Sequence, residues 1–231
     1  KYVETLRNEI NEVRVSEGKR PLAKEEKKEI VSTTDPECGM FHKGEKEKQL
    51  AYSTQVACDE NGWVTNAKVY PGNMNDNNSG VDFLETINKD NEVENVVMDA
   101  GYTSPVLLNE VLKANKKPII PYTRPKGSKS RKENDLETPI PSTSYKYDEE
   151  NNVYVCPLGI LTYRGMNSQG NLVYKTSTKD CKNCPLRNRC TNQKYKEIQR
   201  HFLERATEKA REIRLSPLGK ELYPLRKMTI E

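Results

Sequence analysis

The chain has 231 residues, of which 34% are hydrophobic and 31% charged, with 38 Lys and Arg against 34 Asp and Glu and a formal net charge of +4. No apolar run approaches the roughly 20 residues that a membrane-spanning helix needs, which excludes a membrane protein and a membrane partner. Because the sequence starts at Lys1 and shows no signal peptide, we expect a fragment of a longer protein.

Basic residues are concentrated toward the C-terminal end. Residues 174–231 hold 15 Lys and Arg against 7 Asp and Glu, a net charge of +8. Positive charge of this kind favours a polyanion such as DNA, and the alternative is a solvated helix surface without a partner. The side chains that we expect to contact phosphates include Lys194, Lys196, Arg200, Arg205, Lys209, Arg211 and Arg214.

Residues 1–50 have the pattern of a charged helical segment followed by a linker. Acidic and basic residues alternate at helical spacing up to Arg14, and residues 24–29 are all charged. Apolar Val3, Leu6, Ile10 and Val13 recur every three or four residues. This spacing predicts a helix with one narrow apolar stripe that packs on another part of the molecule.

Residues 51–125 have the pattern of an α/β domain. Period-two runs over residues 51–58 and 63–71, joined by a turn that contains Asn61-Gly62, predict a β-hairpin. A helix over 77–90, a buried strand over 95–98, a helix over 105–114 and a strand over 119–122 are predicted next. This order of elements predicts a mixed sheet flanked by helices.

Residues 126–195 are predicted to form an insertion, because Gly, Ser, Asn and Pro punctuate a polar stretch with only short strand-like runs. Residues 196–231 are predicted to return to the main domain as two helices, the first over 196–215. His201 is expected to be a surface residue of that first helix.

Four cysteines in the predicted insertion have the spacing C-x24-C-x2-C-x5-C; they are Cys156, Cys181, Cys184 and Cys190. Zinc prefers four soft ligands in a tetrahedron, and a C-x2-C turn supplies two of them. The segment is too polar to fold on burial alone, so one structural zinc ion would contribute folding energy. Two disulfides, or four unpaired thiols, are the alternatives.

Two carboxylates are candidate functional residues. Asp99 directly follows the predicted strand at 95–98, and active sites of open α/β sheets gather at the carboxyl ends of strands. The alternative role for Asp99 is to cap the turn into the next helix. Glu231 ends the helix-like stretch that contains Arg226 and Lys227, and its position alone indicates nothing.

Taken together, these features resemble the DDE transposases of bacterial insertion sequences, in the branch with a cysteine-bearing insertion in the catalytic domain. The resemblance covers nearly the whole chain. The matching motifs are residues 32–37 (STTDPE) with Lys43-Gly44, 52–56 (YSTQV) leading to Asp59, 71–76 (PGNMND), 98–102 (MDAGY), 120–122 (IPY), the cysteines, and Arg226-Lys227 before Ile230-Glu231. The D-A-G-Y motif and the final I-E after R-K are the most specific.

The resemblance implies a ribonuclease-H-like fold, a mixed sheet flanked by helices and interrupted by a small cysteine-rich, zinc-ribbon-like insertion. It implies that Asp99 and Glu231 are catalytic and coordinate two magnesium ions. Hard magnesium prefers carboxylate oxygens, and two ions about 4 Å apart can hold the attacking and leaving oxygens of a phosphodiester in line. The expected activity is DNA cleavage followed by strand transfer.

One expected motif is missing. The family's first aspartate lies on an upstream strand in a D-G-T-like motif, and no such motif is present; Asp35 lies in a loop-like Thr-Thr-Asp-Pro stretch instead. We therefore expect the chain to begin after that strand and to be inactive alone, because the magnesium site lacks one ligand.

Two other functions are compatible with parts of the sequence. A nucleic-acid-binding zinc module from a degenerate, inactive element would share the cysteines and the basic C-terminal region but would need no catalytic carboxylates. A nuclease of the same fold would use the same carboxylates without strand transfer. For a transposase we expect DNA partners, namely element ends and target, a homo-oligomer of the full-length protein, and a bacterial cytoplasmic location at the nucleoid.

Overall fold

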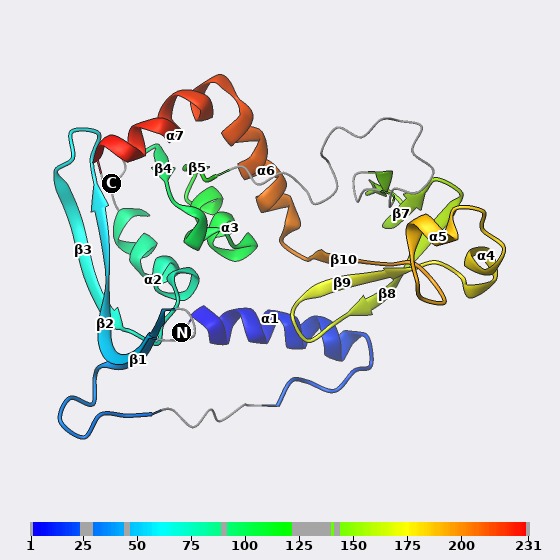
Figure 1. The fold of residues 1–231 in the computed structure, drawn as a ribbon, viewed down its shortest axis with the longest axis horizontal. Coiled ribbons are helices and arrows are strands. Elements are labelled where there is room, and N and C mark those ends of the chain that lie inside the picture. The colour runs from blue at the N-terminus through cyan, green and yellow to red at the C-terminus, as the bar shows by residue number, and fades with distance from the viewer. Residues whose placement is uncertain are drawn as a thin grey trace. The chain divides into compact units, whose positions relative to one another are not determined.

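The computed structural model describes residues 2–23, 30–43, 47–88, 92–121, 140 and 144–229. The chain divides into two compact units (Figure 1). Unit 1 comprises residues 1–6, 23–122 and 203–231, and unit 2 comprises residues 7–22 and 123–202. Among the described residues, no helix is long and apolar enough to span a bilayer.

The described residues of unit 1 form five strands in two sheets, together with helices. Strands β1 (Gly39–Lys43), β2 (Glu47–Cys58) and β3 (Val64–Pro71) form an antiparallel sheet in that order, and β4 (Asn95–Val97) pairs in parallel with β5 (Lys117–Ile119). Its helices are α2 (Asp76–Asn88), the short η1 (Ala100–Tyr102), α3 (Pro105–Lys113), α6 (Glu204–Leu215) and α7 (Pro217–Thr229).

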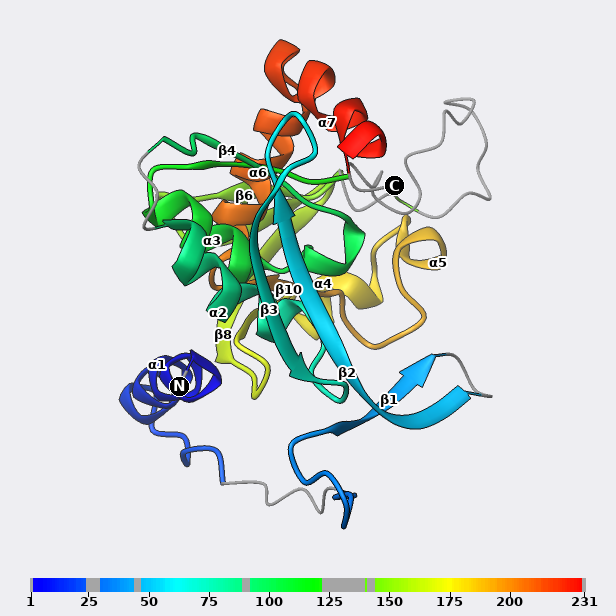
Figure 2. The same ribbon diagram turned by 90° about the vertical axis from the view of Figure 1, so that its left-hand side faces the viewer.

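The β2–β3 hairpin is the longest strand pair of unit 1 and faces the viewer in Figure 2. Its turn forms because the Asp59 carboxylate accepts hydrogen bonds from the backbone N–H groups of Asn61 and Trp63, both at 2.9 Å, and Gly62 adopts a φ of 85°. Such a positive φ favours glycine. The predicted hairpin is confirmed.

The core of unit 1 lies between its helices and the β4–β5 pair. Leu107, Leu108 and Val111 of α3 are completely buried and pack with Ala206 and Ala210 of α6. Small alanines let the two helices approach closely, and burial of each leucine contributes roughly 1.5–3 kcal/mol. Helix α3 starts where expected because Ser104 caps it and Pro105 occupies its first turn.

The predicted order of elements from β2 to β5 is confirmed, with two differences. Strand β1 was not predicted, and the strands of unit 1 form a three-stranded and a two-stranded sheet instead of one mixed sheet. In the part of the chain that the structure describes, β4 bonds to β5 and no strand joins β4 to β2. The architecture is a mixed α/β arrangement consistent with a ribonuclease-H-like transposase domain.

Unit 2 contains a five-stranded antiparallel sheet in the order β10-β9-β8-β7-β6. Its elements are β6 (Lys146–Asp148), β7 (Val153–Cys156), β8 (Gly159–Met166), β9 (Asn171–Lys175), α4 (Thr178–Lys182), α5 (Arg187–Cys190) and β10 (Glu197–His201). Helix α1 (Tyr2–Ser16) begins in unit 1, and its larger part belongs to unit 2.

The core of unit 2 is made mainly of tyrosines. Tyr174 is completely buried, and the rings of Tyr147, Tyr154 and Tyr163 lie 5.1 to 6.0 Å from it. The Tyr174 hydroxyl donates a hydrogen bond to the side-chain oxygen of Asn152 at 2.6 Å. Aromatic rings bury much apolar surface while their hydroxyls remain hydrogen-bonded, which is how a polar segment acquires a core.

The predicted helix over residues 196–215 is wrong in its first part. Residues 197–201 form β10, paired with β9, and the helix α6 begins only at Glu204. The reason is that Arg200 is 9% exposed and its guanidinium lies 4.4 Å from the centre of the Tyr147 ring. A strand places Arg200 on the tyrosine core.

His201 is therefore a strand residue, not the helix-surface residue that was predicted. Its ring centre lies 4.9 Å from that of Phe202, and burial lowers its pKa below the ordinary value of 6.5. A histidine with a lowered folded-state pKa is easier to protonate in the unfolded chain. Its contribution to stability is therefore present above about pH 6.5 and is lost as the pH falls.

We expect His201 to titrate below pH 6.5 in the folded protein because partial burial of its ring disfavours the charged form. The chain has two histidines, so NMR titration of the imidazole protons with a His201→Gln variant as assignment control measures this directly. The same variant should lessen the loss of unfolding free energy between pH 7 and pH 5. A His201 pKa at or above 6.5 would contradict the expectation.

Candidate active site

Asp99 lies in the turn that follows β4. The backbone N–H of the preceding Met98 donates to the carbonyl oxygen of Ile119 at 3.0 Å, so the pairing of β4 with β5 extends to the residue before Asp99. The Asp99 carboxylate then accepts a hydrogen bond from the backbone N–H of Gly101 at 2.7 Å and caps η1. The capping role considered for Asp99 is present, and it fixes the carboxylate at the carboxyl end of β4.

Asp76 lies beside the same turn, although it is 23 positions earlier in the sequence. A β-carbon built on Gly101 would lie 2.7 Å from Oδ2 of Asp76 and 3.1 Å from Oδ1 of Asp99. The two carboxylates thus flank Gly101, and they approach it more closely than a side chain at this position would allow. In the sequence, Asp76 ends the matching motif at residues 71–76, and with Asp35 it is an alternative third ligand should the chain alone prove active.

Gln55 and Tyr102 complete the surroundings of the two carboxylates. The Tyr102 hydroxyl donates a hydrogen bond to Oε1 of Gln55, and Nε2 of Gln55 donates to Oδ1 of Asp76 at 3.2 Å. Burial, together with the nearby charges of Asp76 and Asp99, raises the pKa of Tyr102 to about 12. Neither Gln55 nor Tyr102 was predicted as a site residue. The sequence offered one signal for Gln55, namely that it is a polar residue within a predicted strand.

Glu231, the second predicted catalytic residue, lies outside the described residues. Helix α7 is described to Thr229, and it packs against β4 and β5. The ring of Tyr223 lies 4.3 Å from the guanidinium carbon of Arg214 and 5.7 Å from that of Arg226. These stacked side chains join the last turns of α7 to α6.

The structure does not support the zinc site predicted for the four cysteines, and that site stays a prediction. Among the described residues, which include all four, no group of three or more His, Cys, Asp or Glu could hold a metal ion, and every cysteine is free. The alternative of unpaired thiols therefore agrees with the structure, and that of two disulfides does not.

Two of the sulfur atoms have hydroxyl partners. Cys190 Sγ lies 3.0 Å from the Tyr145 hydroxyl, and Cys181 Sγ lies 2.8 Å from the Thr176 hydroxyl. Cys156 and Cys190 also pack against the tyrosine core. Burial, the hydrogen bond with Cys190 and the nearby sulfur atoms raise the pKa of Tyr145. The cysteines thus contribute to the packing of unit 2.

The Asp99 turn has the chemistry that magnesium requires. Magnesium is usually bound by one or two carboxylates together with substrate phosphates, and it keeps several waters. One oxygen of Asp76 and one of Asp99 lie next to the same point, where a β-carbon at Gly101 would be 2.7 and 3.1 Å from them. These residues therefore fit a magnesium ion.

The basic residues predicted to contact DNA belong to different units. Arg200 is buried on the tyrosine core, and the Lys196 ammonium lies 4.8 Å from the centre of the Tyr145 ring. Both belong to unit 2, whereas Arg205, Lys209 and the later basic residues lie on α6 and α7 in unit 1. Arg200 and Lys196 therefore lie outside the C-terminal helices α6 and α7, which carry the later basic residues.

Comparison with protein families gives one match. The model described as a transposase DDE domain matches residues 24–228, a range that includes Asp76, Asp99 and the four cysteines. A comparison with curated proteins finds no match, and neither does a comparison with solved structures.

Proposed function

Since the chain belongs to the transposase DDE domain family, we propose that it carries part of a magnesium-dependent site that cleaves DNA and transfers a strand of an insertion sequence. Membership of this family implies DNA transposition. The observation that supports the proposed site is the position of Asp99, which is held at the carboxyl end of β4 in the D-A-G-Y motif.

Asp99 is proposed as a magnesium ligand and Glu231 as a second one. When bound, two magnesium ions would align and stabilise the attacking and leaving oxygens of a phosphodiester. The backbone of Gly101 holds one oxygen of Asp99, and the packing of α7 on β4 and β5 supports the helix that leads to Glu231. In the proposed reaction, water cleaves a phosphodiester at the element end, and the released 3′ hydroxyl attacks target DNA.

The experiment that tests this proposal is a cleavage and strand-transfer assay with the protein expressed from its own gene. Joined products that form in magnesium, and not in chelator, would support transposition. Hydrolysis without joining would favour a nuclease, and DNA binding without either reaction would favour the nucleic-acid-binding module.

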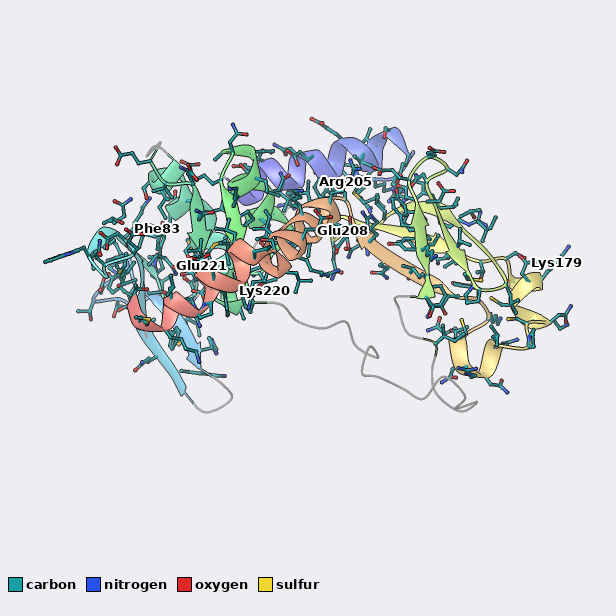
Figure 3. The ribbon with its side chains drawn as sticks, turned by 90° about the horizontal axis from the view of Figure 1, so that it is seen from above. Phe83, Lys179, Arg205, Glu208, Lys220 and Glu221 are labelled. Carbon is teal, nitrogen blue, oxygen red and sulfur yellow. The ribbon has the colours of Figure 1, made fainter. Side chains whose placement is uncertain are left out.

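Helices α6 and α7 are proposed to contact DNA. Figure 3 shows side chains of both signs on them, including Arg205 and Glu208 on α6 and Lys220 and Glu221 on α7. Lys209 already pairs with Glu212 at 3.1 Å, so part of the positive charge is offset within the helix. We therefore propose a smaller number of phosphate contacts than the net charge of +8 suggests.

Duplex DNA should bind the chain more weakly as salt rises, because each neutralised phosphate releases counterions. The slope of log affinity against log salt is about −0.9 per phosphate contact. Fluorescence anisotropy at several salt concentrations measures it, and Lys220→Gln combined with Arg205→Gln should make the slope shallower by up to about two contacts. A matched control is Lys179→Gln on α4 of unit 2. An affinity that did not change with salt would contradict the proposed contacts.

The finer assignments remain proposals. We propose that the transposase acts at the nucleoid in the bacterial cytoplasm and forms a homo-oligomer. We also propose that the chain is organised as a charged helical segment with a linker, the first part of the catalytic domain, the cysteine-bearing insertion and the C-terminal part of the catalytic domain, over residues 1–50, 51–125, 126–195 and 196–231. The chain alone is proposed to be inactive.

A further inference from the structure

Gln55 is an amide buried in the middle of an otherwise half-exposed hairpin. Its exposed fraction is 2%, whereas its neighbours Thr54 and Val56 on β2 are exposed. Burial of an amide is unfavourable unless its hydrogen bonds are replaced. An apolar side chain at this inward position would avoid that cost, so the amide needs an explanation in terms of its partners.

Both ends of the Gln55 amide have a partner next to Asp99. Oε1 accepts from the hydroxyl of Tyr102, three residues after Asp99, and Nε2 donates to Asp76, whose other oxygen borders Gly101. One side chain of β2 is thereby tied both to η1 and to the first residue of α2.

We propose that Gln55 is a positioning residue of the transposase site, which holds Tyr102 and Asp76 so that the turn after β4 presents the Asp99 carboxylate to a divalent cation. This inference rests on the proposed function. Gln55 acts through its two partners and does not itself contact the cation.

Without Gln55, each of its two partners would lose a hydrogen bond that holds it in place. Asp76 and Asp99 carry like charges around the same glycine, so Asp76 would be repelled from its position unless a donor held it. Gln55 supplies that donor. Tyr102 ends η1, so its anchored hydroxyl restrains the short helix that Asp99 caps.

The protonation state of Tyr102 agrees with this arrangement. With a pKa of about 12, its hydroxyl remains a donor throughout the neutral pH range. The Tyr102 hydroxyl therefore donates to the amide oxygen of Gln55, and the amide NH2 group of Gln55 is available to donate to Asp76. Residues that orient a ligand in this way typically change metal affinity by 10–100-fold when they are removed.

The test measures binding of Mn²⁺, a paramagnetic substitute for Mg²⁺, to the chain by electron paramagnetic resonance. Tyr102→Phe removes one hydrogen bond and Gln55→Leu removes both. Tyr70→Phe is the matched control, because Tyr70 is also a buried tyrosine of unit 1 whose hydroxyl donates to an aspartate, Asp82, at 2.7 Å.

We expect Mn²⁺ affinity to fall by about tenfold or more in Tyr102→Phe and Gln55→Leu, and to stay unchanged in Tyr70→Phe. Tyr102→Phe and Tyr70→Phe should lower the melting temperature by similar amounts. The double variant should bind Mn²⁺ no more weakly than Gln55→Leu alone, because Tyr102 acts through Gln55.

The possible failures are distinguishable. If Asp99→Asn loses Mn²⁺ while the Tyr102 and Gln55 variants bind as tightly as the unmodified chain, Gln55 is only structural and the inference is wrong, although the proposed function stands. If the unmodified chain and Asp99→Asn bind Mn²⁺ equally, the proposed metal site is wrong and the inference fails with it. If Gln55→Leu does not fold, the Mn²⁺ affinity of Tyr102→Phe compared with that of Tyr70→Phe still tests the inference.

Discussion

Asp99→Asn is expected to abolish magnesium-dependent DNA cleavage in the protein expressed from its own gene. Asparagine keeps the oxygen that accepts from the Gly101 N–H, so the cap of η1 should survive the change. The negative charge is lost, and with it a hard ligand for magnesium. Since metal ions supply several kcal/mol of transition-state stabilisation, we expect a loss of about a thousandfold or more in cleavage rate.

The measurement is cleavage of labelled element-end DNA, with thermal unfolding of both proteins followed by circular dichroism. Asp59→Asn is the matched control, because Asp59 also caps a turn of unit 1 through two backbone N–H groups but lies in the β2–β3 turn. We expect this control to cleave at the normal rate. Cleavage by Asp99→Asn at more than a tenth of that rate would remove Asp99 from the catalytic residues.

Local sequence patterns predicted the regular elements of unit 1 well. The Asn61-Gly62 turn, the Ser104 cap with Pro105 and the spacing of the buried α3 residues each act within a few positions, so they can be read without knowledge of the fold. Residues 197–201 were misread because Arg200 looks like part of a basic helix. Its burial depends on tyrosines from other strands of unit 2, which no local pattern contains.

The candidate site was predicted only in part for the same reason. Asp99 follows a strand directly, and this local signal was enough to select it. Asp76 and Gln55 are brought to it by tertiary packing across 23 and 44 positions of sequence. The spacing of the cysteines did not indicate their hydroxyl partners, of which Tyr145 is 45 positions from Cys190 in the sequence.

Gly101→Ala tests the space between Asp76 and Asp99 directly. The backbone conformation of Gly101 is not in the positive-φ region, so strain from that source is not expected. The added methyl group would instead lie 2.7 Å from Oδ2 of Asp76 and 3.1 Å from Oδ1 of Asp99, and both carboxylates would have to move. Because these are the ends of side chains, the fold should accommodate the change with a loss of roughly 1–3 kcal/mol or less in unfolding free energy.

Function should be affected far more than stability. Misplacement of a reacting or ligating group by about 1 Å can cost on the order of 100-fold in rate, so we expect a loss of this size in cleavage and a clear loss of Mn²⁺ affinity. Gly159→Ala is the control, since its β-carbon would meet only Cys156 Sγ at an ordinary 3.6 Å. If Gly101→Ala unfolded the protein, the expected small loss of stability would be wrong. If the folded variant cleaved DNA as fast as Gly159→Ala, the spacing of the two carboxylates would have no functional role. A folded variant that binds DNA normally but neither holds Mn²⁺ nor cleaves would show that this space is the cation site.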